Sequence, residues 1–338
     1  MLESFHPLKV TIFTQTLIGN RIGLNLQGMT GIVTKSTGSH YLVRIDKGKV
    51  VDCVLKGKLR LDDRKTTNPV AVGDTVDVEQ DGDDNIISKI YPRRNYIIRK
   101  SINLSKQAQI LASNLDQAIL VATLVSPRTS LGFIDRFLIT AEAYSIPAKI
   151  IFNKADILDE ESLKLQQQII DIYTKVGYEC LVVSSLNGQN LEKVKELLKD
   201  KTTLIAGHSG VGKSTLVNAI EPTLNIKTGA ISSAHAKGTH TTTFAELHEL
   251  SFGGFIIDSP GIKELGLVEM KKEEVGHYFP EIRNLMNACK FNNCLHVNEP
   301  KCAVKLAVEK GEISEERFRS YLGILTGEEM DWKEWEVK

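Results

Sequence analysis

The chain contains no apolar run that approaches the roughly 18 residues needed to cross a bilayer. Its first residues, MLESFHPLKVTIFTQTLIGN, lack both the basic lead-in and the small-residue cleavage site of a signal peptide. The sequence therefore predicts a cytoplasmic protein with no membrane partner.

Cysteine is scarce, with five residues in a chain of 338. So few cysteines exclude a disulfide scaffold, and three of them crowd into residues 289–302, which favours a metal site. Cys53 and Cys180 stand alone within predicted strands, and we expect them to be core residues.

The formal net charge is zero, because 42 Lys and Arg residues balance 42 Asp and Glu residues. This balance argues against a simple nucleic-acid coat. Residues 1–106, however, carry 17 basic against 11 acidic side chains, and a basic front end can contact a phosphate backbone. An ordinary solvated surface is the alternative. The basic side chains include Arg93, Arg94, Arg99 and Lys100.

Five short segments between about residues 28 and 95 alternate apolar and polar positions or are rich in β-branched residues. They are TGIVTKS, HYLVRID, VVDCVLK, DTVDVEQ and NIISKIY. Glycine-containing turns separate them, so the pattern predicts a small β-barrel. The OB-fold is the commonest barrel of this kind that binds nucleic acid, and an SH3-like barrel fits the pattern nearly as well.

From about residue 107, apolar strands alternate with amphipathic helices. The strands are QAILVATLV, AKIIF, ECLVVSS, TTLIAG, FAELHELSF and GGFIID, and LGFIDRFLITAEAY is one of the intervening helices. Such alternation predicts a mostly parallel sheet with helices on both faces. From about residue 268 the pattern is mainly helical around the cysteine cluster.

The strongest motif is GHSGVGKS, residues 207–214, which follows an apolar strand and opens a helix. Gly207 and Gly212 allow the backbone N–H groups to point at phosphate oxygens. Lys213 can place its charge on the β- and γ-phosphates, and Ser214 can bind Mg²⁺. The expected phosphate-loop contacts are Gly207, His208, Ser209, Gly210, Val211, Gly212, Lys213, Ser214 and Thr215.

DSPG, residues 258–261, ends the apolar run FGGFIID. Beside a phosphate loop, Asp258 can hold the Mg²⁺ shell and the Gly261 N–H can meet the γ-phosphate. Alone, this tetrapeptide is an ordinary turn.

NKAD, residues 153–156, ends another strand. Asp156 can accept two hydrogen bonds from the N1 and N2 edge of guanine, an edge that adenine does not offer. Lys154 can lie along the base and Asn153 can brace the phosphate loop. A turn with Asp156 as a helix N-cap is the alternative. SSL, residues 184–186, predicts a second base-contacting loop with Ser184 and Ser185.

The order of these motifs indicates a circular permutation. In a Ras-like GTPase the phosphate loop precedes the guanine loops, whereas here NKAD and SSL precede GHSGVGKS, and DSPG comes last. Because the termini of compact domains often lie close together, such cuts are tolerated. The DSPG loop then leads directly into the C-terminal domain, so loss of the γ-phosphate could reposition that domain.

The segment CKFNNCLHVNEPKC supplies three thiols and one imidazole. These four groups suit a closed, structural Zn²⁺ site without an open catalytic position. Buried cysteines beside a chance histidine are the alternative. The predicted zinc ligands, one ion per chain, are Cys289, Cys294, His296 and Cys302.

With these motifs in order, the sequence closely resembles the bacterial small-ribosomal-subunit-dependent GTPase A family. The resemblance covers about residues 28–338 and includes VGDTV, PRRNYIIRK, NKAD, GHSGVGKSTLVN, GTHTTT, DSPGI and NEPKCAVK. It implies a late-acting assembly factor for the 30S subunit that binds 16S rRNA and is displaced together with other assembly factors. Its slow GTP hydrolysis would be stimulated by the subunit.

The resemblance also implies a domain order. We expect an OB-fold RNA-binding domain over 29–95, a permuted GTPase domain over 96–267 and a helical zinc domain over 268–338. Residues 1–28 match nothing in the family and are interpreted as a non-native extension or an upstream start, with Met29 a natural first residue. We expect a monomer.

Catalysis is expected to need a group outside the DSPG loop. Many Ras-like proteins place a water-orienting glutamine where this chain has Ile262, so the intrinsic rate should be low. In GTHTTT, Thr242 is expected to reach Mg²⁺ and the γ-phosphate, and His240 to position water. The predicted catalytic groups are Lys213, His240 and Thr242, and the Mg²⁺ ligands are Ser214, Thr242 and Asp258.

Two rival functions are the alternatives. A permuted GTPase that acts on the large subunit would not be expected to carry the barrel and the zinc cluster. A GTP-gated RNA-binding module with incidental hydrolysis would carry the same motifs, and a hydrolysis-dead variant would distinguish it.

Overall fold

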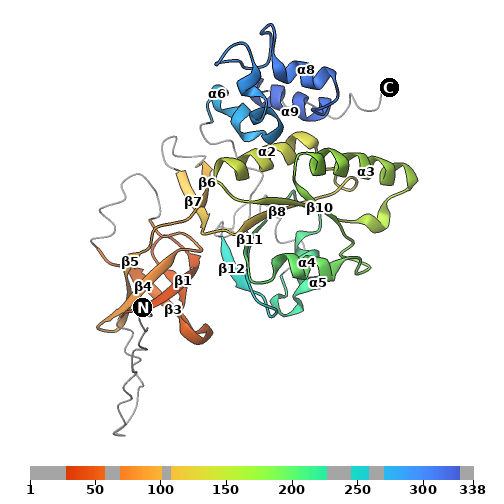
Figure 1. Ribbon diagram of the computed structural model, residues 1–338. Helices are drawn as coiled ribbons and strands as arrows, with labels where there is room; N and C mark the ends of the chain where they lie inside the picture. The colour runs from red at the N-terminus through yellow and green to blue at the C-terminus, as the bar shows by residue number, and fades with distance from the viewer. Residues whose placement is uncertain (1–27, 58–68, 101–107, 227–244, 259–269, 328–338) are drawn as a thin grey trace, which may run out of the picture.

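The computed structural model describes residues 28–57, 69–100, 108–226, 245–258 and 270–327. A β-barrel, a helix-covered sheet and a helical cluster follow one another along the chain (Figure 1). The barrel lies beside one edge of the sheet, and the helical cluster lies over helix α2. No helix within these described ranges is both long and apolar enough to span a membrane.

The barrel contains the five predicted strands. These are β1 (Met29–Ser36), β2 (Tyr41–Arg44), β3 (Val50–Leu55), β4 (Thr75–Asp81) and β5 (Asp84–Ile90). Their order is β1-β2-β3-β5-β4, and β4 also pairs with β1, which closes the barrel. Alternate side chains such as Val43, Val76 and Val78 fill its core. The closed barrel is OB-like.

A hairpin of β6 (Tyr96–Lys100) and β7 (Ala108–Ser113) connects the barrel to the sheet. Its position is fixed by Asp74, which is fully buried. Arg93 donates from Nε and Nη2 to the two oxygens of Asp74 at 2.7 Å each, and Ser113 Oγ donates to Oδ1 at 2.6 Å. Arg93 therefore fastens the barrel to the hairpin. Arg94 likewise forms an ion pair, with Asp116 at 2.7 Å.

The central sheet consists of β8 (Gln117–Ala122), β9 (Ala148–Phe152), β10 (Glu179–Val182), β11 (Thr202–Ala206), β12 (Glu246–Glu249) and β13 (Phe255–Asp258). Its order is β10-β9-β8-β11-β13-β12, and only β12 runs antiparallel to its neighbour β13. All six residues of β8 are buried, as expected for a strand covered on both faces.

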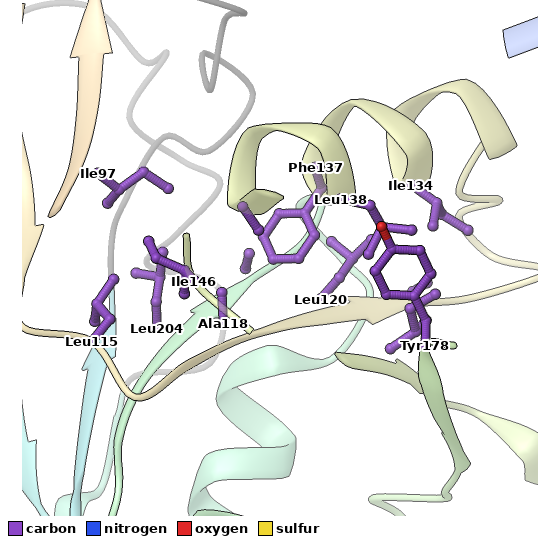
Figure 2. Packing of buried hydrophobic residues seen from close by; sticks show 14 of the residues in the cluster. Ile97, Leu115, Ala118, Leu120, Ile134, Phe137, Leu138, Ile146, Tyr178 and Leu204 are labelled. Carbon is purple, nitrogen blue, oxygen red and sulfur yellow. The ribbon is translucent and has the colours of Figure 1, made fainter. Parts of the chain in front are cut away.

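Helices α2 (Leu131–Ala143) and α3 (Glu160–Lys175) cover one face of this sheet, and α4 (Leu191–Leu198) and α5 (Lys213–Ile220) cover the other. Figure 2 shows Ile134, Phe137 and Leu138 of α2 packed over the sheet. Ser130 caps α2 and Asp159 caps α3. The alternative in which Asp156 caps the helix is therefore wrong.

The barrel and the sheet form one continuous eleven-stranded sheet, because β1 pairs with the outer strand β12 at Lys35 and Glu246. Lys35 Nζ lies 3.2 Å from a carboxylate oxygen of Glu246. Arg44 donates from Nε to Glu249 at 3.0 Å, and its guanidinium lies over the ring of Phe255. The barrel thus covers the edge of β12.

The C-terminal cluster contains α6 (Lys272–Val275), α7 (Pro280–Arg283), α8 (Ala303–Glu309) and α9 (Glu315–Thr326). Its core includes Phe279, Ile282 and Tyr321, and Ile139 of α2 belongs to the same core. Beside Ile139, Arg317 of α9 donates to Asp135 of α2 at 2.6 Å, with both side chains almost completely buried. This domain is therefore docked on α2.

Candidate functional site

The phosphate loop connects β11 to α5 and is shaped by glycines with positive φ. Gly207, Gly210 and Gly212 have φ values of 144°, 85° and 91°. A methyl group on Gly207 would lie 2.2 Å from the carbonyl oxygen of Val121, and one on Gly212 would lie 2.5 Å from Nδ2 of Asn153. Only glycine fits at these two positions without a shift of the neighbours.

Lys213 begins α5 and curls back over the loop. Its ammonium group donates to the carbonyl oxygens of Gly207 at 2.6 Å and His208 at 2.8 Å. Lys213 and Ser214 are both buried at the N-terminus of this eight-residue helix. A cation, a helix N-terminus and N–H groups of a tight loop together fit a phosphate group.

Asn153 joins the NKAD segment to both the phosphate loop and the SSL segment. Its Nδ2 donates to the carbonyl oxygen of Val211 at 2.9 Å. Its Oδ1 accepts from the main-chain N–H of Ser185 at 3.1 Å and from the Ser185 hydroxyl at 2.9 Å. Because Asn153 is only 2% exposed, these bonds hold three loops in one fixed arrangement.

The two segments expected to read the base also meet. The Ser184 hydroxyl donates to Oδ1 of Asp156, which is exposed, and Lys154 adopts the left-handed conformation with φ of 65°. The Lys154 ammonium donates to the carbonyl oxygen of Ser126, in the loop after β8. A carboxylate that is accessible and held on one side is suited to accept donors from a base edge.

The expected Mg²⁺ ligands are described only in part. Asp258 ends β13, and its main chain pairs with Ile205 of β11, two residues before the phosphate loop. This register places the end of β13 beside the start of the phosphate loop, at the carboxyl edge of the sheet, where ligands of such sheets bind. Gly261, His240, Thr242 and the side chain of Asp258 lie outside the described residues.

The four predicted zinc ligands converge in the C-terminal domain. Their ligand atoms all lie within 4.8 Å of one another. Cys289 Sγ is 3.9 Å from Cys302 Sγ, and Nδ1 of His296 is 3.6 Å and 3.3 Å from these two sulfurs. A tetrahedral zinc ion with bonds of about 2.3 Å to sulfur and 2.0 Å to nitrogen separates two sulfurs by about 3.8 Å and sulfur from nitrogen by about 3.5 Å. The cluster is therefore compatible with zinc.

Without a metal, the surroundings of this cluster favour neutral ligands. Burial raises the pKa of the Cys294 thiol to about 12 and also raises that of Cys302. Burial lowers the pKa of His296. Thiolates in such a place need a cation, which a zinc ion supplies. The His296 Nε2 atom is buried and, among the described residues, has no hydrogen-bond partner.

Sequence reasoning missed several residues that organise the site. Phe133 of α2 stacks on His208 of the phosphate loop, with ring centroids 3.7 Å apart and planes at 30°. Asp135 lies at a buried position of the same helix, and a charge between apolar helix residues was the only available signal. The hydroxyl group of Tyr173 donates to Asp135 at 2.9 Å.

The fold and these loops define a circularly permuted P-loop GTPase. Residues 90–268 match the RsgA GTPase family and residues 30–87 match the RsgA N-terminal domain. The chain belongs to the RsgA GTPase family.

Named relatives and solved structures agree with this assignment. A small ribosomal subunit biogenesis GTPase RsgA from Flavobacterium psychrophilum is 53% identical over 309 residues, which cover 90% of this chain and 95% of the relative. The RsgA protein of Bacteroides fragilis is 52% identical over 303 residues, 89% of this chain and 97% of that protein.

The crystal structure of YjeQ from Thermotoga maritima superposes with a TM-score of 0.73 at 34% identity and covers 88% of this chain and 98% of that one. The structure of YloQ, a circularly permuted GTPase, gives 0.70 at 33% identity, with 91% and 97% coverage.

Proposed function

We propose that this chain hydrolyses GTP to GDP and phosphate as a biogenesis factor of the small ribosomal subunit. The observation that carries the proposal is the convergence of the phosphate loop, NKAD and SSL around Asn153. Relatives more than 50% identical over most of their length are named small ribosomal subunit biogenesis GTPases. The activity follows from the site, and the part in small-subunit biogenesis follows from the names of the relatives.

In this proposal, Asp156 selects guanine, and Lys154, Ser184 and Ser185 shape the base pocket. The phosphate-loop residues 207–215 hold the phosphates. Lys213, now bonded to main-chain carbonyls, would turn to the β- and γ-phosphates. The residues assigned to Mg²⁺, which would neutralise charge on these phosphates, are Ser214, Thr242 and Asp258.

We assign Cys289, Cys294, His296 and Cys302 to one structural Zn²⁺ per chain. The spacing of three of the four ligand atoms supports this assignment. A bound zinc would hold together a small domain whose core is formed by short helices and the ligand segment.

Four hydrophobic clusters support the proposed division of the chain. One core fills the barrel, assigned to 29–95 as the RNA-binding domain. Two clusters sandwich the sheet of the GTPase domain, assigned to 96–267. A further cluster belongs to the zinc domain, assigned to 268–338.

The barrel and the zinc domain are proposed to contact 16S rRNA on either side of the GTPase domain. Arg93 is held by the buried Asp74, so the RNA contacts are assigned to exposed basic side chains of the barrel. Lys49 and Lys89 are exposed, and Lys89 lies over the ring of Tyr91. Such contacts predict an affinity for the subunit that falls with salt. The chain would act as a monomer in the cytoplasm and leave with other assembly factors.

Deletion of the barrel would also expose the edge of β12. The RNA contact is therefore tested with substitutions at exposed lysines of the barrel. Lys49→Glu/Lys89→Glu should weaken 30S binding and reduce its salt dependence, while GDP affinity stays unchanged. Lys193→Glu/Lys199→Glu, at two exposed lysines of α4 and its C-terminal end, is a control of equal charge change. Equal 30S binding by both variants would refute a barrel contact through these lysines.

The proposed function is tested by the GTPase rate of the full chain with and without purified 30S or 50S subunits. Stimulation by 30S alone is the expected result. Stimulation by 50S would favour the large-subunit alternative. A hydrolysis-dead variant that still supports 30S maturation in cells would favour a GTP-gated RNA-binding module.

A further inference from the structure

The phosphate loop has few side chains that can hold its conformation, because three of its residues are glycines with positive φ. His208 provides an aromatic contact to a helix outside the loop, through its stacking on Phe133. The carbonyl oxygen of the same His208 accepts a hydrogen bond from Lys213 at 2.8 Å. Any movement of His208 against α2 therefore displaces a group that holds the phosphate-binding lysine.

Phe133 itself has a fixed place. It lies in the first turn of α2, where its main-chain N–H donates to the Ser130 hydroxyl at 3.2 Å. Ser130 follows the loop that supplies the Ser126 carbonyl to Lys154. The start of α2 thus contacts the phosphate loop, and the loop that precedes α2 contacts the NKAD segment.

The opposite face of α2 holds the C-terminal domain. Asp135 follows Phe133 by two residues, which is about 200° around a helix of 3.6 residues per turn. Its Oδ1 accepts from Arg317 at 2.6 Å and from Tyr173 at 2.9 Å. Arg317 also donates from Nε and Nη2 to Glu281 at 2.7 and 3.0 Å, within the C-terminal domain.

These contacts are buried, so water cannot easily replace them. Asp135 is 0% exposed and Arg317 is 1% exposed. The guanidinium also lies over the rings of Tyr173 and Phe279. Ile139, one helical turn after Asp135, extends the same interface. A shift of the C-terminal domain must therefore shift α2 or break a buried ion pair.

We propose that Phe133 is a positioning residue for the phosphate loop, and that helix α2 couples it to the C-terminal domain through Asp135 and Arg317. Docking of that domain on a partner would then change how tightly the loop holds phosphates. The proposal rests on guanine-nucleotide binding as proposed above. It assigns to α2 a coupling function beyond its part in the core.

The first test concerns Phe133 alone. Phe133→Leu keeps apolar bulk and loses the stacked ring, so GDP affinity, measured with a fluorescent GDP analogue, should fall by about 2- to 10-fold. Phe133→Tyr should restore it. If Phe133→Leu binds GDP as the parent does, or if Phe133→Tyr does not rescue the loss, Phe133 does not position the loop through its ring.

The second test measures coupling in a double-mutant cycle. Asp135→Asn preserves shape and leaves Arg317 paired with Glu281, so the buried guanidinium keeps a counter-ion. It should lower GDP affinity by about twofold or more, and this loss should shrink in the Phe133→Leu background. Arg319→Gln, which removes an exposed ion pair of the same helix α9, is the matched control. If the loss of GDP affinity in the double variant equals the product of the losses in Asp135→Asn and Phe133→Leu, the two residues are not coupled and the proposal is overturned.

A readout without nucleotide separates this inference from the proposed function. Hydrogen exchange at the main-chain amides of 208–213 should accelerate in Asp135→Asn and stay unchanged in Arg319→Gln. Zinc content and far-UV circular dichroism establish that both variants are folded. A parent protein that binds no guanine nucleotide would contradict the proposed function, whereas unchanged exchange in Asp135→Asn contradicts the coupling.

Discussion

The hydroxyl group of Ser184 donates a hydrogen bond to the carboxylate of Asp156, across 28 residues of sequence. Ser184 is completely buried, while Asp156 remains exposed at the carboxyl edge of the sheet. The bond holds one oxygen of Asp156 in place and leaves the carboxylate accessible. This geometry explains how the carboxylate of Asp156, which follows β9, can be presented to the edge of a guanine base.

Asp156→Asn should weaken GDP and GTP binding and favour xanthine nucleotides, because the amide can face the C2 carbonyl of xanthine. Two charge-assisted hydrogen bonds of about 1.5–3 kcal/mol each are replaced, so the loss for GDP should be about 100-fold or more. Calorimetry with GDP, XDP and ADP checks this, with Asp171→Asn on the exposed face of α3 as control. Comparable affinities of the parent protein for GTP and ATP would contradict the assignment.

Gly207→Ala should abolish tight nucleotide binding and destabilise the fold. The added methyl group would lie 2.2 Å from a main-chain oxygen of β8, and such overpacking costs about 1–3 kcal/mol beyond the strain of a positive φ. Gly177→Ala is the control, since Gly177 has φ of 99° with no atom within 4 Å of the new methyl. Equal urea midpoints for the two variants would show that the clash is relieved without cost.

Native protein should contain one zinc ion per chain. Cys294→Ser should lose the metal and the helical structure of the C-terminal domain, because a structural zinc contributes directly to folding. Elemental analysis and hydrogen exchange over residues 272–326 measure both effects, and Cys180→Ser in β10 serves as control. Substoichiometric zinc in native preparations, or a fully protected domain in Cys294→Ser, would count against the site.

His240→Ala should remove most of the hydrolysis stimulated by 30S subunits and leave GTP affinity within a few-fold of the parent. The reason is that Ile262 cannot orient water, so His240 is the candidate for this role. Single-turnover rates with saturating 30S provide the measurement, and His248→Ala on β12, eight residues further along the chain, controls for loss of an imidazole. If stimulated turnover survives, the ribosome must supply the group in trans.

Glu221→Gln should reduce stability at neutral pH and flatten the acid limb of the stability curve. Hydrogen bonds from Thr223 and from the Ser251 N–H, the latter at 2.6 Å, hold the pKa of Glu221 below its usual value. A lowered folded-state pKa stabilises above the unfolded-state pKa, and this contribution of about 1–3 kcal/mol is lost as pH falls through the folded value.

Urea unfolding between pH 3 and pH 7, a range of about four units around the carboxyl pKa values, measures the contribution of Glu221. Glu192→Gln, on an exposed side chain of α4, should leave the curve unchanged. If the free energies of unfolding of the parent and of Glu221→Gln differ by the same amount across this range, the pKa of Glu221 is the same in the folded and the unfolded state.

The strands, the main helices and the meeting of NKAD, SSL and the phosphate loop were predictable, because each depends on local pattern and on where parallel strands end. Apolar runs placed β8, β9 and β11, and the turn residues after them placed the loops. The sheet order then brings these loops to one edge, as the permuted motif order implied.

The contacts between domains could not be predicted in this way. Arg317 and Asp135 are 182 residues apart, and in sequence Arg317 is one more charge on an amphipathic helix. Arg93 was interpreted as part of a basic surface, whereas a buried Asp74 holds it. The residues around a charged side chain in sequence do not reveal its ion-pair partner in the fold. That partner decides whether the charge is buried or faces solvent.

The strand order also sets the sequence of events while the chain is being made. Among the strands of the central sheet, β8, β9 and β10 emerge first, together with the loops assigned to the guanine base, and the phosphate loop comes later. About 80 residues separate Ala122 from Thr202. At a rate of synthesis of about 5–20 residues per second, the edge of β8 that pairs with β11 stays unpaired for about 4–16 s. During that interval an apolar strand edge is open to wrong partners, and a nascent chain cannot be rescued by nucleotide binding.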